Sequence, residues 1–208
     1  TPKPSSAASD VYKRQGSNLP SVIGWRTIDD TNKMIEIAQT KKRAVVIGGG
    51  LLGLECARGL LDQGMEVTVL HLADWLMEMQ LDRKAGEMLK ADLEKQGMKI
   101  ELQANSKEII GDKDVEAIKL ADGRVIETDL VVMAVGIRPY TEVAKDSGLD
   151  VNRGIVVNDY MQTSDSHIYA GGECAEHDGK VYVLVAPLYE QGKVLADYLT
   201  GKETKGYK

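Results

Sequence analysis

The sequence predicts an α/β fold built around a parallel β-sheet, and three observations support this prediction. An apolar run at 44–47 ends on three consecutive glycines, a segment rich in Leu, Glu and Ala continues to Gln63, and residues 66–70 (EVTVL) have the character of a second buried strand. A strand, a tight turn, a helix and a second strand within about 30 residues form a βαβ unit, which sets its two strands in parallel. The crossover of such a unit is almost always right-handed.

Hydrophobic periodicity predicts the other elements of the first 136 residues. Apolar residues recur at helical spacing in two further segments, and they alternate at strand spacing in three short segments, the last two joined by the turn signal Asp122-Gly123. A final run is apolar from Leu130 to Val135, as expected for a central strand covered on both faces. In chain order we expect a helix near 31–38, a helix at 82–96, a strand at 99–102, an antiparallel meander near 106–110, 114–120 and 124–128, and a central strand at 129–135.

A different pattern begins after Pro139. About 70 residues with few large apolar side chains bury too little surface to form an independent domain, so this part is expected to pack on another one. We expect a short helix near 141–147, paired extended segments at 155–160 and 167–170, a Gly-Gly corner, and a helix from Pro187 to Thr200.

The two ends of the chain are expected to lie outside the folded domains. Residues 1–15 show no periodicity, and their last six letters, DVYKRQ, resemble the translation of an adapter used in sequencing libraries. We therefore interpret 1–15 as an artefact leader, with a natural disordered tail as the alternative. Residues 202–208 have the character of a charged linker.

Composition argues against several classes of function. With 26 Lys and Arg against 32 Asp and Glu, the net charge is −6, so a basic face for nucleic acid or anionic lipid is not expected. No apolar run reaches the length of about 18 residues that a spanning helix needs. Cys56 and Cys174 lie far apart without a histidine cluster, which argues against a zinc site or a disulfide scaffold. We expect a cytoplasmic protein with no metal site in this chain, and His177 in a solvated turn.

The triple glycine fits the G-x-G-x-x-G fingerprint of a dinucleotide site at Gly48, Gly50 and Gly53. Its mechanism is geometric, because the first glycine permits the tight turn, the second lets the backbone approach a pyrophosphate, and the third allows close packing of helix and sheet. The anion is held by the N-terminus of the helix that begins at Leu51. The fingerprint lies after a strand and before a helix, as it must, so the sequence predicts a Rossmann-like domain with a dinucleotide site.

The second half of the fingerprint is different here. An acidic residue normally follows the second strand and binds the adenosine ribose, but this strand ends at His71. NAD and NADP therefore stay open, and His71 is either a contact of the adenosine end or a surface histidine. Glu55 lies two positions past Gly53, either facing the nicotinamide end of a cofactor or solvated on the helix surface. We expect Cys56 to pack in the core.

Three stretches of the chain resemble, in order, the NAD(P) motif, the connecting motif and the second flavin motif of the two-dinucleotide flavoprotein reductases. They are residues 48–55 (GGGLLGLE), 128–139 (TDLVVMAVGIRP) and 163–173, which end in YAGGE. The resemblance covers about 190 residues. It implies an oxidoreductase with FAD and NAD(P)H as cofactors.

The same resemblance implies roles for individual residues. Glu55 would orient the carboxamide of nicotinamide and is the candidate catalytic residue. Val135 and Gly136 would border the cofactor at the domain junction. Gly172 and Glu173 would hold the ribityl chain of FAD, although glutamate at 173 departs from the commoner aspartate.

Three further stretches are similar to the large subunit of assimilatory NAD(P)H-dependent nitrite reductases: 71–82, 172–177 (GECAEH) and 184–191 (LVAPLYEQ). In that family electrons pass from NAD(P)H through FAD to an iron-sulfur cluster and sirohaem, where nitrite becomes ammonium. The helix start at Ala186 and Pro187 would face the flavin and stabilise negative charge on it. Val183 stands where the family pattern leads us to expect glycine.

The resemblance also divides the chain. Residues 16–25 would end a half of the FAD domain that the sequence does not contain, 26–136 would form the NAD(P)-binding domain, and 137–201 the C-terminal part of the FAD-binding domain. The implied partners are the remaining FAD-domain half and the redox domains with their iron-sulfur cluster and sirohaem. A small subunit and a second copy of the chain are further candidate partners.

Two other functions fit the motifs. One is a stand-alone NADH-dependent rubredoxin or ferredoxin reductase, and the other is a non-enzymatic module that senses NAD(P). The expected flavin motif argues against the sensor, because a sensor has no use for a flavin site.

Overall fold

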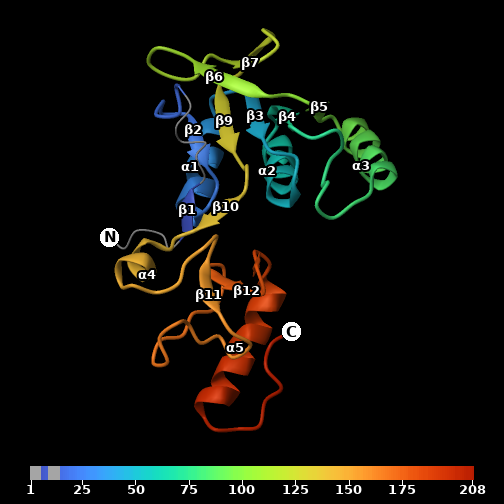
Figure 1. The fold of residues 1–208 in the computed structure, drawn as a ribbon. Coiled ribbons are helices and arrows are strands. Elements are labelled where there is room, and N and C mark those ends of the chain that lie inside the picture. Colours follow the sequence, from blue (N-terminus) through green and yellow to red (C-terminus); the bar gives the residue numbers. More distant parts are fainter. Residues whose placement is uncertain (1–5, 9–14) are drawn as a thin grey trace. The chain divides into compact units, whose positions relative to one another are not determined.

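The computed structural model describes residues 6–8 and 15–208, which form two compact units (Figure 1). The described residues of one unit are 15–136, and those of the other are 6–8 and 137–208. Most of the expected leader at 1–15 lies outside the described residues. Its strand β1 (Ser6–Ala8) pairs antiparallel with β10 (Ile137–Pro139).

The unit that contains the C-terminal residues has, besides the β1–β10 pair, a small sheet, a short helix and a long helix. We predicted that 155–160 pairs with 167–170, and this prediction is wrong, because the first of these strands pairs in parallel with a later one. The sheet has the order β11 (Ile155–Val157), β12 (Ala175–His177), β13 (Lys180–Val181), and the helices are α4 (Glu142–Asp146) and α5 (Val185–Leu199).

Local hydrogen bonds explain the difference. The Asn158 side chain accepts from the backbone N–H groups of Tyr160 and Gln162 at 2.9 and 3.1 Å, and the Thr163 N–H donates to the Ile168 carbonyl at 2.9 Å. The segment after β11 therefore folds back on itself. Glu176 of β12 in turn accepts from the Gly154 N–H at 2.8 Å, which ties β12 to the turn before β11.

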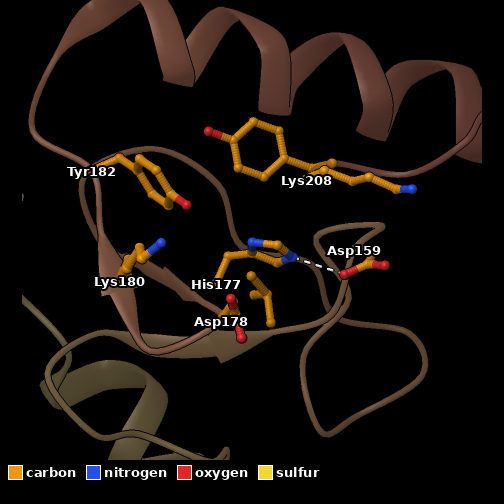
Figure 2. A pocket seen from close by; sticks show the side chains of 8 residues that line it. Asp159, His177, Asp178, Lys180, Tyr182 and Lys208 are labelled. Carbon is orange, nitrogen blue, oxygen red and sulfur yellow. Dashed lines mark hydrogen bonds and ion pairs between the residues drawn. The ribbon is translucent and has the colours of Figure 1, made fainter.

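His177 is buried in β12, although the sequence led us to expect it in a solvated turn (Figure 2). Its Nε2 lies 2.9 Å from Asp159 Oδ1, and its ring packs edge-on against Tyr207 with the ring centres 5.2 Å apart. The register of β12 directs His177 into a cluster that also contains Val157 and Met161, both buried. Tyr207 is itself buried, so the segment interpreted as a linker contributes to this core.

The other unit is built on a five-stranded sheet in which every neighbouring pair is parallel. The prediction of a parallel α/β sheet is thus confirmed. The strand order is β2-β9-β3-β4-β5. The chain adds β4 and β5 on one side of β3 and then returns to place β9 on its other side, so the order of strand addition reverses between β3 and β9. The strands are β2 (Val22–Gly24), β3 (Arg43–Ile47), β4 (Glu66–Leu70), β5 (Lys99–Glu101) and β9 (Leu130–Met133).

Strand β2 is a correction to the predicted organisation. We assigned 16–25 to another domain, but Val22 and Gly24 pair with Val131 and Met133 of β9. Three residues are too short for a periodicity to be read from the sequence, which is why the strand was not predicted. The sheet of this unit therefore begins before residue 26.

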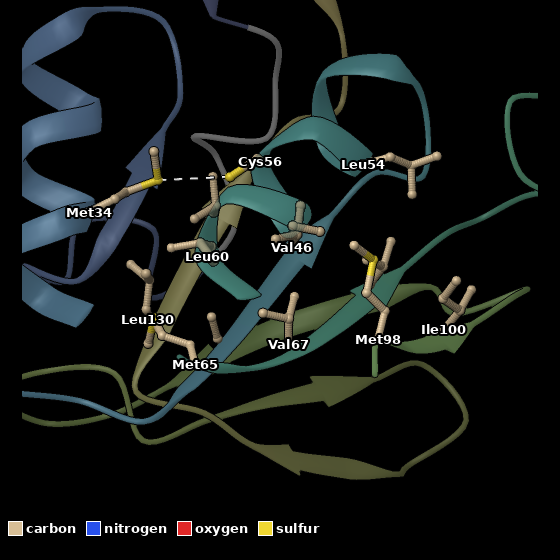
Figure 3. Close-up of a cluster of buried hydrophobic side chains, with 14 of the residues drawn as sticks. Met34, Val46, Leu54, Cys56, Leu60, Met65, Val67, Met98, Ile100 and Leu130 are labelled. Carbon is tan, nitrogen blue, oxygen red and sulfur yellow. Dashed lines mark hydrogen bonds between the residues drawn. The ribbon is translucent and has the colours of Figure 1, made fainter. Parts of the chain in front are cut away.

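Three helices pack against one face of the sheet, and Figure 3 shows two of them, with Met34 on the first and Leu60 on the second. They are α1 (Ile28–Ala38), α2 (Leu51–Asp62) and α3 (Arg83–Lys95). Thr27 and Asp30 form a reciprocal capping box at the start of α1, and Asp82 accepts from the Ala85 N–H at the start of α3. The apolar stripes of the helices meet the sheet residues of the same face, among them Ala44, Val46, Val67, Val69, Leu130 and Val132.

The predicted meander covers the opposite face. It consists of β6 (Ser106–Ile110), β7 (Ala117–Leu120) and β8 (Val125–Glu127), paired antiparallel in that order. Ile109 and Ile118 pack on Val45 and Val131 of the parallel sheet. Both faces of β3 and β9 are therefore covered, which explains why β9 is apolar at every position and β3 is apolar at every position after Arg43.

A polar network joins three loops of this unit. The Asp114 carboxylate accepts from Lys41 Nζ, from the Ser21 N–H at 3.1 Å and from the Val115 N–H at 2.9 Å. Ser21 is buried and precedes β2, and Lys41 precedes β3. Partial burial by itself raises the pKa of Asp114, but the hydrogen bonds from Lys41, Ser21 and Val115 outweigh it and lower the pKa to about 2.

We expect Asp114→Asn to lower the free energy of unfolding by about 1 kcal/mol at pH 7. The full pKa shift would correspond to more, but 37% of the Asp114 side chain is exposed and solvent screens the pair. Because the folded pKa is depressed, the contribution is present above the unfolded pKa and is lost as the pH falls toward 2. Urea unfolding at pH 7 and near pH 3 measures it, with Asp112→Asn, an exposed neighbour, as the control. Equal losses for both variants would contradict the assignment.

Candidate dinucleotide-binding site

The glycine turn lies at the carboxyl end of β3 and depends on two close approaches. Gly48 has φ +118°, and a Cβ at this position would lie 2.2 Å from the Ala134 carbonyl oxygen. A Cβ at Gly53 would lie 1.9 Å from the Gly48 carbonyl oxygen. The chain can therefore fold this turn under the first turn of α2 only with glycine at both positions.

Gly50 differs from its neighbours, because its surroundings are open. It is the N-cap of α2, with φ −86° and no side-chain cap. A Cβ placed there would meet nothing within 4 Å. The first backbone N–H groups of a helix have no partner within the helix, so the open space in front of Gly50 can hold an anion.

A hollow of about 390 Å³ lies in front of this turn. It is formed at the carboxyl ends of β9, β3 and β4, where the strand order reverses and where ligands of open α/β sheets bind. The structure brings together six of the residues predicted from the sequence. Those that line the hollow are Gly48, Gly50, Leu51, His71, Val135 and Gly136.

His71 lies beneath the glycine turn, with 6% of its surface exposed. Its Nδ1 accepts from the Gly49 N–H at 3.0 Å, and its Nε2 lies 2.9 Å from Glu78 Oε2. Because Nδ1 accepts a hydrogen bond, it carries no hydrogen, so the hydrogen of the neutral ring is on Nε2, which donates to Glu78. His71 is therefore not the surface histidine that we left open, and both of its ring nitrogens are engaged within the protein.

Glu55 occupies an exposed position on α2 and lines a second hollow, of about 230 Å³, with Trp25 and Met34. Glu55 is not among the described residues that line the hollow in front of the glycine turn, so its role at the nicotinamide end stays a prediction. Cys56 packs in the core as predicted, with its sulfur 3.8 Å from the Met34 sulfur. Burial raises the pKa of the Cys56 thiol to about 12, which keeps it protonated.

The residues expected at the flavin lie in the other unit. Ala186 and Pro187 are in the first turn of α5, whose N-cap Leu184 makes no side-chain cap. Gly172, with φ +90°, donates its N–H to Gln191 Oε1 at 3.0 Å. The contacts of these residues with a flavin stay a prediction, as does the role of Glu173.

Gln191 is a residue that the sequence analysis did not single out. It is 1% exposed, and its amide nitrogen has no hydrogen-bond partner among the described residues. The available signal is its position: a polar residue in the middle of the stripe of α5 that contains Leu188 and Leu195. Gln191 fixes the Gly172 corner against the helix.

Within residues 6–8 and 15–208, no group of three or more potential ligands is placed to hold a metal ion. Among the helices of the same residues, none is both long and apolar enough to cross a membrane.

A glycine turn at the switch point of a parallel sheet, with an antiparallel meander on one face, defines a Rossmann-like dinucleotide-binding domain. The chain belongs to the pyridine nucleotide-disulphide oxidoreductase family, which matches residues 8–192. It is 58% identical to the nitrite reductase [NAD(P)H] of Bacillus subtilis (strain 168) over 192 residues. It is 42% identical to the nitrite reductase (NADH) large subunit of Escherichia coli (strain K12) over 194 residues.

These matches cover 92% and 91% of this chain but only 24% and 23% of the two relatives, so the chain spans about a quarter of their length. The ferredoxin reductase for the CYP199A2 system from Rhodopseudomonas palustris has a similar structure, with a TM-score of 0.88 at 32% identity. That match covers 94% of this chain and 50% of the reductase. The resemblance to nitrite reductase large subunits, inferred from the sequence, is confirmed.

Proposed function

We propose that this chain is the nicotinamide-binding part of a flavoprotein nitrite reductase, together with part of its FAD-binding domain. In this proposal hydride passes from NAD(P)H to FAD, and electrons continue to an iron-sulfur cluster and sirohaem that reduce nitrite to ammonium. The observation that carries the proposal is the open glycine turn at the N-terminus of α2, in a chain 58% identical to a nitrite reductase.

The residues of the turn bind and orient the nicotinamide cofactor. The backbone N–H groups at the start of α2 hold its diphosphate, and the open Gly50 leaves room for the oxygens to approach. Val135 and Gly136 border the path toward the reacting ring, and Glu55 orients its carboxamide. Fixing the two rings in contact supplies most of the rate enhancement, and the transfer needs no protein acid or base.

The second unit contributes to flavin binding. Gly172, held by Gln191, and Glu173 contact the ribityl chain, and the uncapped start of α5 at Ala186 stabilises negative charge on the ring. When bound, FAD would supply the conversion of a two-electron hydride transfer into one-electron transfers. The iron-sulfur cluster and sirohaem would be held by parts of the protein outside this chain, and the intact protein would work in the cytoplasm.

The second candidate is a stand-alone ferredoxin or rubredoxin reductase. It is favoured by the structural similarity to the Rhodopseudomonas palustris ferredoxin reductase and by 33% identity to the rubredoxin-NAD(+) reductase of Alcanivorax borkumensis. The coding sequence downstream of Lys208 distinguishes the two functions. A cysteine-rich cluster motif there supports the nitrite reductase. A reading frame that stops at the end of the flavoprotein region supports the alternative.

The purified chain is expected to bind NADH or NADPH in a one-to-one complex, to retain FAD weakly and to leave nitrite unreduced. Isothermal titration with NADH, NADPH and FAD measures the first two properties, and an assay for ammonium measures the third. Absence of saturable binding of either nicotinamide nucleotide would exclude the proposed site. A tight one-to-one complex with FAD would instead show that this chain holds a complete flavin site.

A further inference from the structure

The end of β4 lacks the acidic side chain that normally binds the adenosine ribose. His71 stands there, and both of its ring nitrogens are already bonded, one to the Gly49 N–H and the other to Glu78. The imidazole therefore has no free nitrogen with which to bind a ribose hydroxyl. The carboxylate that it holds, Glu78, lines the same hollow as the glycine turn.

The loop that carries Glu78 is fixed to the glycine turn. The Met77 N–H donates to the Gly49 carbonyl at 3.1 Å, and Met77 adopts φ +57°. Leu76 is fully buried, and a Cβ on Gly49 would lie 2.6 Å from it. Trp75 closes the loop by donating its ring N–H to the Leu81 carbonyl at 3.0 Å. The position of Glu78 is thus fixed by backbone hydrogen bonds and core contacts of its loop.

The charge that lines the hollow is negative only, among the described residues. Glu78 is the only charged residue among the described residues that line it, and none of them is Lys or Arg. Its side chain keeps 35% of its surface exposed while one oxygen accepts from His71 Nε2. A carboxylate in this state accepts hydrogen bonds from hydroxyl groups and repels a phosphate.

We propose that Glu78 replaces the missing strand-end acid and selects the nicotinamide nucleotide without a 2′-phosphate. Its carboxylate accepts from the ribose hydroxyls of NADH, whereas the 2′-phosphate of NADPH meets a negative charge with no cation nearby. His71 is the positioning residue, which holds Glu78 and the Gly49 turn in one arrangement. This inference rests on the proposed function, because it assumes that the hollow binds the adenosine end of the cofactor.

The test compares the dissociation constants of NADH and NADPH for the purified chain. The unmodified chain is expected to bind NADH more tightly by on the order of tenfold. In Glu78→Gln the preference falls to about twofold or less, because the amide keeps the shape but not the charge. Glu36→Gln removes one charge from exposed α1 and is the matched control, with an unchanged preference. A thermal melt of each variant verifies that it is folded.

His71 is tested by the same ratio. His71→Gln can still accept from Gly49 and donate to Glu78, so it retains part of the preference, and His71→Leu loses it. A merely structural role would weaken both nucleotides equally and leave their ratio intact. If Glu78→Gln or His71→Leu keeps the ratio of the unmodified chain, this inference is wrong while the dinucleotide site stands. If the unmodified chain binds neither nucleotide, the proposed function fails, and the inference with it.

Discussion

Gly53→Ala is expected to destabilise the protein strongly, although alanine normally favours a helix. The added methyl group would lie 1.9 Å from the Gly48 carbonyl oxygen, and neither the helix nor the turn can yield without breaking the other. Overpacking against backbone costs about 3 kcal/mol, enough to remove much of the stability of a domain of this size. Urea unfolding followed by circular dichroism measures the loss.

The same helix provides the control for this prediction. Gly59 lies on the exposed side of α2, and a Cβ there would meet nothing within 4 Å. Gly59→Ala should therefore raise the free energy of unfolding by about 1 kcal/mol, through helix propensity alone. The two substitutions are chemically identical and should act in opposite directions. Similar effects for both would mean that α2 does not approach the turn as closely as described.

The elements that the sequence predicted well are those whose stabilising contacts are local. The strand at 66–70 was predicted to the residue, and the helices at 51–63 and 82–96 to within about one residue at each end. Their apolar periodicity, the Asp82 cap and the glycines that end them are all written within a few positions of each other. The glycine motif was recognisable for the same reason.

The elements that were missed depend on contacts between distant residues. Nothing within 22–24 reveals that this strand pairs with β9 more than 100 positions later. The partner of β11 could not be predicted either, because the intervening segment satisfies its own hydrogen bonds. His177 was assigned to a solvated turn because no suitably spaced partner in the sequence supported a metal site, whereas β12 turns it inward.

The candidate site likewise has a part that local sequence predicts and a part that depends on contacts between separate segments. The positions of Gly48, Gly50 and Gly53 follow from their spacing, and all three belong to the observed turn. The pairing of His71 with Glu78 requires a loop that returns to the turn, which no periodicity encodes. Sequence reasoning identified an anomaly at the end of β4, and only the folded chain supplies the carboxylate that compensates for it.

Gly50→Thr is expected to abolish nucleotide binding while leaving the fold intact. Gly50 has the backbone conformation of an ordinary N-cap, and threonine caps helices about as well as glycine, so stability should change by about 0.5 kcal/mol or less. The threonine side chain, however, would fill the open space in front of the first turn of α2. We propose that this space holds the cofactor diphosphate.

The size of the loss follows from the bonds that are broken. Displacing the diphosphate removes at least two charge-assisted hydrogen bonds, worth about 3 kcal/mol together, so the dissociation constant of NADH should rise by on the order of a hundredfold. Titration of NADH into Gly50→Thr measures this, and Gly59→Ala should bind like the unmodified chain. Three glycines of one turn and helix thus have separate signatures, since Gly53→Ala loses stability, Gly59→Ala gains it, and Gly50→Thr loses only the ligand. Undiminished binding by Gly50→Thr would show that the nucleotide does not lie at the N-terminus of α2.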